Sequence, residues 1–169
     1  MTKPLALFPV AVALSLGLIV GCSSTPTDST SSTSESVPSG STETQSEIYT
    51  EDGIAIKGAD PVAYFEQGEY VAGTSEFQHE WDGATWQFAS AENRDTFASS
   101  PETYAPQYGG YCAWAVSQGQ VAPIDPTAWA IVDDKLYLNY SAGVQDRWKQ
   151  DVPGNIAKAD ENWPSVLNN

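Results

Sequence analysis

Cys112 and His79 are the two side chains of this sequence with the most versatile chemistry. The chain has one histidine and two cysteines, and the second cysteine, Cys22, belongs to an apolar N-terminal segment. A thiolate and an imidazole are both ligands for zinc and copper, and a thiol beside an imidazole can act as a nucleophile. The pair is therefore a candidate metal site and, alternatively, the candidate machinery of a thiol-dependent enzyme.

A closed zinc site made only of cysteine and histidine is excluded, because it needs four nitrogen or sulfur ligands. A mixed site is the alternative, in which His79 and Cys112 bind copper or zinc together with one or two carboxylates. The carboxylates considered for this role are Asp60, Glu80 and Asp125. Ligands of one ion have donor atoms within about 4 Å of each other, so the site requires His79 and Cys112 to meet.

Both residues also have a purely structural interpretation. Cys112 can pack as a small apolar side chain between Tyr111 and Trp114. As a nucleophile it would need a group that stabilises the thiolate, and the neighbouring sequence holds no Lys, Arg or His. His79 falls on an expected strand, where its ring can pack in a hairpin. Packing, metal binding and catalysis all remain open for this pair.

Three aromatic residues are candidates for a ligand pocket. The six tryptophans and eight tyrosines of the chain are expected mainly to form the core. Tyr108, Tyr111 and Trp114 lie beside Gly109-Gly110, where the backbone can turn sharply. As an alternative to packing in the core, these three side chains would line a ligand pocket.

The composition excludes several classes of function. The chain has 22 acidic and 7 basic side chains, which gives a formal net charge of −15. Nucleic-acid binding needs clustered Lys and Arg, and adhesion to anionic lipid needs the same, so neither is expected. The sequence also lacks a Gly-rich phosphate loop ending in Lys, a nucleophile elbow around Ser, and the HExxH zinc motif.

The first 22 residues are typical of an export signal. Lys3 precedes an apolar run over residues 5–20, which is too short for a stable membrane span. The run ends in Leu18-Ile19-Val20-Gly21-Cys22, which resembles the bacterial lipoprotein box. The resemblance implies cleavage after residue 21 and lipidation of Cys22, palmitate included, so that acyl chains anchor the protein in the membrane. A plain transmembrane anchor, or an ordinary signal with a chance cysteine, is the alternative.

The resemblance also implies a location in the cell envelope, facing the periplasm. Ser23 follows the cysteine where lipoproteins of the inner membrane often carry Asp, so the outer membrane is favoured over the inner one. Of the next 25 residues, 23–47, 16 are Ser or Thr and none is aromatic. Such a stretch cannot bury enough apolar surface to fold, and residues 22–48 are expected to form a disordered tether. The folded domain is expected over residues 49–169.

Local signals predict short helices and two hairpins in this domain. Asp60 is an expected helix N-cap before Pro61, and Ser90 and Ser141 are expected to cap later helices. Asp82-Gly83 and Asp133-Asp134 are the expected hairpin turns. The predicted class is α+β, with a small antiparallel sheet of hairpins and several short helices. The expected helices lie near 61–65, after the Ser90 cap and around Phe97, over 111–116 with Gly119 as the end, and near 142–149 and 155–162. A short turn is expected from Pro101 to near Pro106, and the expected strands are 77–81, 84–89, 129–132 and 135–139.

The order of these motifs resembles the YHS-domain family. The residues that carry the resemblance are Asp60-Pro61-Val62, Gly83-x-x-Trp86-x-Phe88-Ala89-Ser90, Phe97 and Pro101-x-x-Tyr104, followed by Tyr108–Ala113 and Leu136–Tyr140. The last two segments are similar to a longer bacterial subfamily of exported proteins. YHS domains resemble the small TRASH-type metal-binding modules, so the resemblance implies a fold of this kind and transition-metal handling.

The sequence departs from the family at two positions that would hold a metal. Where the metal-binding relatives carry cysteine, this chain has Ala63 and Ala89, whereas His79 falls near the histidine of the family. We therefore expect a membrane-tethered, non-catalytic YHS-type binding module with transition-metal handling as one of its functions. A structural or protein-interaction lipoprotein without a small ligand is the alternative. A thiol-dependent enzyme using Cys112 with His79 is the third hypothesis.

Overall fold

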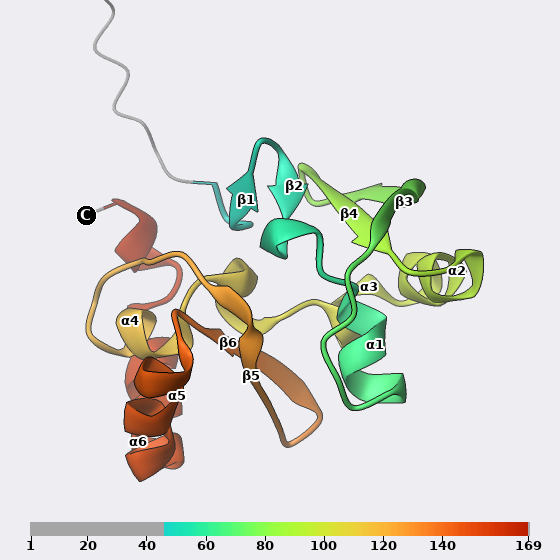
Figure 1. The fold of residues 1–169 in the computed structure, drawn as a ribbon. Coiled ribbons are helices and arrows are strands. Elements are labelled where there is room, and N and C mark those ends of the chain that lie inside the picture. The colour runs from blue at the N-terminus through green and yellow to red at the C-terminus, as the bar shows by residue number, and fades with distance from the viewer. Residues whose placement is uncertain (1–45, 169) are drawn as a thin grey trace, which may run out of the picture. The chain divides into compact units, whose positions relative to one another are not determined.

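A computed structural model describes residues 46–168 of the chain (Figure 1). The expected signal peptide, Cys22 and nearly all of the expected tether lie outside the described residues. The strands are β1 (Thr50–Glu51), β2 (Ile54–Ala55), β3 (Thr74–Trp81), β4 (Ala84–Phe88), β5 (Asp125–Val132) and β6 (Lys135–Asn139). The helices are α1 (Pro61–Glu66), α2 (Ala91–Ser99), α3 (Pro101–Tyr104), α4 (Ala113–Ser117), α5 (Ala142–Trp148) and α6 (Val152–Asn162), with 3₁₀ turns η1 (Ile56–Gly58), η2 (Gln107–Gly110), η3 (Lys149–Asp151) and η4 (Ser165–Asn168).

The predicted α+β class is confirmed, with a four-stranded sheet in the order β1-β2-β4-β3 and a separate β5-β6 hairpin. One detail differs from the prediction, because β2 pairs with β4 in parallel, through Ile54 and Thr85. Parallel pairing needs a long crossover, and here α1 and β3 supply it between the two strands. The β1-β2 hairpin was not predicted, because strands of two residues are too short to show an alternating pattern.

Capping and turn residues act where the sequence predicts them. The Asp60 carboxylate accepts hydrogen bonds from the first turn of α1, which begins with Pro61. The hydroxyls of Ser90 and Ser141 cap α2 and α5 in the same way. Asp82 has a φ of 50° in the β3-β4 turn, in the left-handed region that aspartate tolerates better than most residues. These local interactions fix the ends of the elements.

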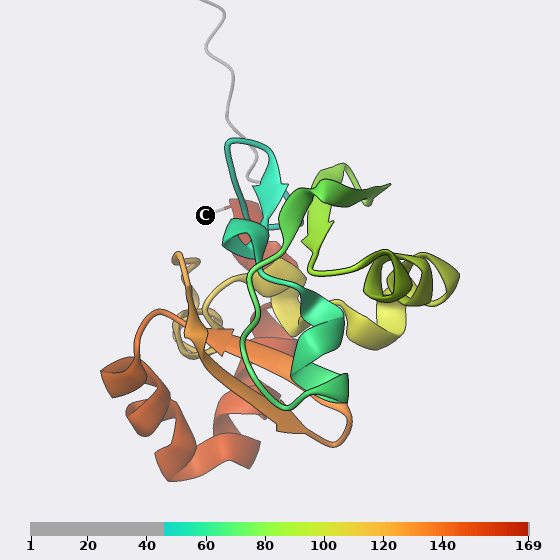
Figure 2. The same cartoon turned by 45° about the vertical axis from the view of Figure 1, so that its right-hand side comes forward.

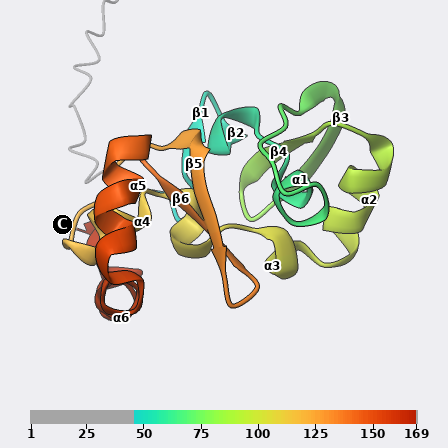
Figure 3. The same ribbon diagram turned by 60° about the horizontal axis from the view of Figure 1, so that its bottom comes forward.

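The β5-β6 hairpin lies between the helices of the two halves of the described domain. Figures 1 and 3 show α4, α5 and α6 on one side of it and α1 and α2 on the other. Figure 2 shows α1 beside the hairpin, and the Tyr64 hydroxyl of α1 donates to the carbonyl of Pro126 in β5 at 2.7 Å. The Tyr64 and Trp129 rings are 5.1 Å apart. This contact joins the N-terminal sheet and helices to the C-terminal part.

Aromatic side chains form the core, as the composition indicates. Trp86 and Phe88 of β4 are fully buried, and both pack against Phe97 of α2 with ring centroids 5.0 and 5.2 Å away. Around β6, Tyr137 packs against Trp148 of α5 at 5.4 Å.

None of the helices described in residues 46–168 combines the length and the apolar character needed to cross a membrane.

Candidate functional site

Cys112 is buried immediately before α4, with 1% of its surface exposed. The main-chain N–H of Tyr140 donates to its sulfur at 3.3 Å, and the thiol lies 3.9 Å from the Oδ1 of Asn139. Burial raises the pKa of the Cys112 thiol, and the main-chain N–H groups around the sulfur oppose the rise only in part. The neutral thiol is therefore the favoured form, and this agrees with the packing interpretation of Cys112.

Asn139 joins the end of β6 to α4 and was not identified as a site residue from the sequence. Its side chain is fully buried, and its Oδ1 accepts a hydrogen bond from the N–H of Trp114 at 3.3 Å as well as facing the Cys112 thiol. Within the described residues its Nδ2 has no hydrogen-bond partner. In the sequence, Asn139 stands out only as a polar residue at the end of a predicted strand that also contains Leu136, Tyr137 and Leu138.

A hollow of about 380 Å³ opens beside the Cys112 thiol, and we call it the Cys112 hollow. Its lining residues come from α4, from the segment between α4 and β5, from the end of β6 and from the start of α5. All of its lining side chains are uncharged, and Tyr140 at its edge is 55% exposed. The lining residues are Cys112, Trp114, Ala115, Gln118, Gln120, Ala122, Tyr140 and Val144.

The three aromatic residues expected to share a pocket lie in three different hollows. Trp114 lines the Cys112 hollow, whereas Tyr111 lines a hollow of about 330 Å³ beside the first described residues. Tyr108 lines a third hollow, of about 310 Å³, with Trp81 and Trp163. The short η2 and α4 segments turn the chain between these residues, so that neighbours in sequence face different sides.

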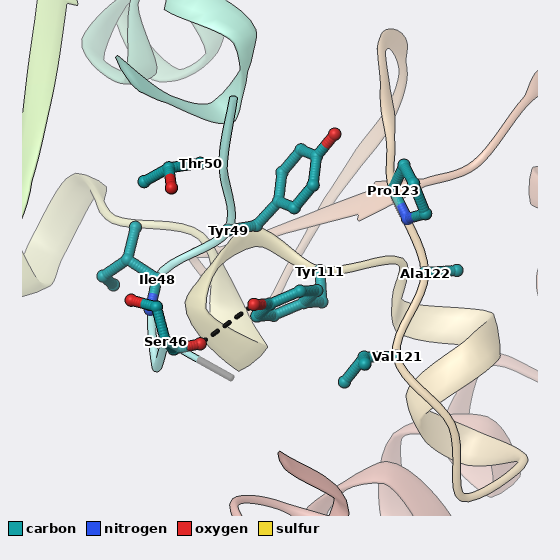
Figure 4. Close-up of a pocket in the computed structure, with 8 residues that line it drawn as sticks. All are labelled: Ser46, Ile48, Tyr49, Thr50, Tyr111, Val121, Ala122 and Pro123. Atoms are coloured by element: carbon teal, nitrogen blue, oxygen red, sulfur yellow. Dashed lines mark hydrogen bonds between the residues drawn. The ribbon is translucent and has the colours of Figure 1, made fainter. Parts of the chain in front are cut away.

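The hollow at Tyr111 is lined by the first residues that the structure describes (Figure 4). The Tyr111 hydroxyl donates to the carbonyl of Ser46 at 2.9 Å, and the Tyr49 ring lies 5.4 Å from the Tyr111 ring. Ile48 is buried in the core, so packing begins within the segment expected to be tether. Tyr111 therefore holds the start of the domain in place, and its hollow contains no charged side chain.

Gly109 allows this N-terminal segment to reach the body of the domain. Its φ is +59°, and a side chain at this position would collide with the main-chain carbonyl of Glu47. The N–H of Tyr49 donates to the carbonyl of Gly109 at 2.9 Å. Glycine is required here both for its backbone conformation and for the close approach of another chain segment.

His79 packs within the first half of the fold rather than at the Cys112 hollow. It is half-buried on β3, opposite Trp86 of β4, and its ring lies 6.2 Å from the Phe97 ring in an edge-on arrangement. The hydrogen-bond partners of the Cys112 thiol instead lie at the end of β6, at Asn139 and Tyr140. This position agrees with the hairpin-packing interpretation of His79.

Two of the three carboxylates considered as further metal ligands, Glu80 and Asp125, are engaged in local hydrogen bonds. Glu80 accepts from the Thr85 hydroxyl at 2.5 Å. Asp125 accepts from the N–H and hydroxyl of Thr127, which lowers the pKa of its carboxyl group. Residues 46–168 contain no group of three or more His, Cys, Asp or Glu side chains that could hold a metal ion. The structure therefore does not bring His79 and Cys112 together with a third such ligand within residues 46–168.

Comparison with known proteins identifies the part of the chain that runs from α1 to η2. The family model of the YHS domain matches residues 62–108. A YHS domain is present. It holds His79, Ala63 and Ala89, whereas Cys112 and all the other residues that line its hollow lie beyond the end of the match. No curated protein and no solved structure matched the chain.

The YHS domain of this chain does not present the donor set of a metal centre. Its two alanines, Ala63 and Ala89, both donate their main-chain N–H groups to the carboxylate of Asp60, at 3.3 and 2.9 Å. The positions where the resembling metal modules carry thiols therefore meet at one buried carboxylate. Val62 and Asn93 also donate to Asp60, so hydrogen bonds within the protein engage both of its oxygens. These residues do not fit a soft transition metal.

Proposed function

We propose that this chain is a lipid-anchored, non-catalytic binding module of the cell envelope, and that it takes an uncharged ligand in the Cys112 hollow. The observation that carries the proposal is the hollow itself, which has an uncharged lining and an exposed tyrosine at its edge. Binding sites for small molecules are typically concave and mainly apolar, with a few polar groups that orient the ligand.

The lining determines the chemistry of the ligand. Trp114, Tyr140 and Val144 offer aromatic and aliphatic surface, and the amides of Gln118 and Gln120 offer hydrogen bonds. A charged ligand would lose its hydration without gaining an ionic partner from this lining, which is unfavourable. The hollow therefore fits an uncharged molecule with an apolar body and one or two polar groups.

The state of the thiol supports binding rather than catalysis. A nucleophilic cysteine needs a lowered pKa or an adjacent base, and the pKa of the Cys112 thiol is raised by burial. The groups that oppose this rise are main-chain N–H groups and not an imidazole or an ammonium group. Cys112 then forms part of the wall of the hollow.

The membrane attachment in this proposal rests on the sequence. Cys22 at the end of the lipobox-like segment would carry the acyl chains, and residues 23–45 would act as the tether to the outer membrane on its periplasmic side. A chain with a formal net charge of −15 gains nothing from anionic lipid, so acyl chains are the appropriate means of attachment.

The proposal is tested by purifying the full chain from membranes in a mild detergent and analysing the molecules it releases on denaturation. We expect an uncharged molecule in near-stoichiometric amount. The variant Val144→Trp, which fills the hollow, should lose it, and the distant exposed variant Glu92→Gln should retain it. Circular dichroism checks that both variants are folded.

Two results would contradict the proposal. An empty native protein would favour the structural or protein-interaction alternative. Stoichiometric copper or zinc in elemental analysis of the same samples, without an organic ligand, would favour transition-metal handling by the YHS domain.

A further inference from the structure

The hollow that Tyr108 lines combines aromatic rings with carboxylates. It has a volume of about 310 Å³ and receives residues from the end of β3, from α3 and η2, and from the end of α6. We call it the aromatic–acid hollow. Its lining residues are Trp81, Glu102, Ala105, Pro106, Gln107, Tyr108, Asp160 and Trp163.

The aromatic walls of this hollow are held in place by packing. The Tyr108 and Trp163 rings lie 6.0 Å apart, inclined at 61° to each other. The Trp81 ring packs at 5.8 Å from Trp86 and at 5.7 Å from Phe97, both of which are fully buried. Rings that are already ordered lose little conformational entropy when a ligand binds.

The two carboxylates of the hollow have no cationic partner among the described residues. The ion pairs in residues 46–168 are Lys57 with Glu51 and Arg94 with Asp95. Glu102 belongs to neither, and Asp160 instead accepts a hydrogen bond from the Tyr108 hydroxyl at 2.8 Å. That bond engages one carboxylate oxygen, Oδ1, and orients the side chain. The hollow is therefore a site of unneutralised negative charge with aromatic walls.

We propose that the aromatic–acid hollow binds a small organic cation with an alkylated ammonium head. Aromatic rings attract such a cation through their negatively polarised faces, and alkyl groups on the nitrogen make contact with the same rings. The carboxylates of Glu102 and Asp160 supply the countercharge. A neutral ligand would gain nothing from these acids, and a bare metal ion would gain little from indole rings.

A neighbouring hollow gives the ligand room for a polar tail. This space of about 340 Å³ shares Trp81 and Glu102 with the aromatic–acid hollow and is also lined by Ser99, Ser100 and Thr103. A short chain ending in a hydroxyl group, attached to the ammonium head, matches these residues. The site lies apart from the Cys112 hollow and does not depend on the function proposed there.

Calorimetric titration of the full chain with choline tests this proposal, with 3,3-dimethyl-1-butanol as the uncharged molecule of the same shape. We expect choline to bind at one site and the neutral alcohol to bind at least tenfold more weakly. Glu102→Gln and Asp160→Asn should each weaken choline binding at least threefold. Asp160→Asn retains an oxygen that can accept the Tyr108 hydrogen bond, so it removes charge with little change in shape.

Two control variants show whether the loss of any exposed acid, or a change in the Cys112 hollow, alters choline binding. Glu92→Gln removes an exposed acid from the first turn of α2, and Val144→Trp fills the Cys112 hollow; both should bind choline as the unmodified chain does. No measurable binding of choline, equal affinity for the neutral alcohol, or unchanged affinity in both Glu102→Gln and Asp160→Asn would overturn the proposal.

Discussion

The Oδ2 atom of Asp60 accepts a hydrogen bond from the main-chain N–H of Ala89 at 2.9 Å. Through this contact one buried carboxylate, whose other oxygen caps α1, also fixes the end of β4. The Nδ2 of Asn93 in α2 donates to the same oxygen at 2.7 Å. Asp60 therefore joins three elements of the YHS domain with hydrogen bonds alone.

Asp60→Asn should destabilise the domain by about 2–4 kcal/mol, because the new amide nitrogen cannot accept from Ala89 and Asn93. The oxygen that remains can still cap α1. Urea denaturation followed by tryptophan fluorescence measures the change. Asp146→Asn, on the exposed face of α5, is the matched control and should change stability by less than about 0.5 kcal/mol. Equal stability of the two variants would contradict the role given to Asp60.

Gly109→Ala should cost about 3 kcal/mol or more, because the methyl group meets the Glu47 carbonyl and the residue has a positive φ. The variant Gly83→Ala measures the cost of the positive φ without the steric collision. Gly83 also has a positive φ, of +74°, but nothing lies within 4 Å of an added methyl group, so a cost of about 1 kcal/mol is expected. Thermal unfolding of both variants gives the comparison, and equal costs would show that the approach of Glu47 is unimportant.

Cys112 should react with iodoacetamide at least roughly 100-fold more slowly in the folded protein than in urea, since the thiol is buried and its pKa is raised. Mass spectrometry of timed samples measures the rate. Cys22 is distinguished from Cys112 by digestion before analysis. Rapid labelling of folded protein would revive the thiol-dependent enzyme hypothesis.

The same thiol should make stability depend on pH. Because the folded state raises the pKa of Cys112, the neutral thiol contributes its full stabilisation below the unfolded pKa of about 8.5. This contribution is lost as the pH rises through the folded pKa, since the unfolded chain releases the proton first. Unfolding free energies from about pH 7 to 10 should therefore fall more steeply for the unmodified chain than for Cys112→Ala. Parallel curves for the two proteins would contradict this expectation.

Cys22→Ser should abolish palmitate labelling and release the protein from the membrane fraction, because a hydroxyl cannot replace the lipidated thiol. Ser23→Ala is the control and should remain lipidated. Metabolic labelling followed by membrane fractionation measures both properties. Retention of the Cys22→Ser variant in washed membranes would favour a plain transmembrane anchor.

The elements of this fold were predictable where residues act on their own neighbours. The cap at Asp60, the cap at Ser90 and the turn at Asp82-Gly83 depend on side chains and backbone within a few positions, and all are confirmed. The second oxygen of Asp60 makes a long-range contact that the sequence does not predict. Its partner Ala89 lies 29 positions away and contributes only a main-chain N–H, which no sequence pattern reveals.

The candidate sites depend on longer-range contacts and were predicted less well. Cys112 and Trp114 do line a hollow, but Tyr140 and Val144 complete it from beyond β6. Tyr108, Tyr111 and Trp114 were grouped because they are close in sequence. The positive φ of Tyr108 and the short η2 turn send them to different sides, and such a backbone conformation is unusual for a tyrosine.

The contacts of Gly109 also determine how the domain carries mechanical load. Any pull on the chain from its N-terminal side reaches the domain first at Ser46, which the Tyr111 hydroxyl holds, and then at Tyr49, which is bonded to Gly109. Because Gly109 belongs to η2 and Tyr111 directly follows it, these bonds pass the force to the middle of the chain rather than to the edge strand β1. The hydrogen bonds of residues 46–49 must therefore break before a pulling force acts on the sheet.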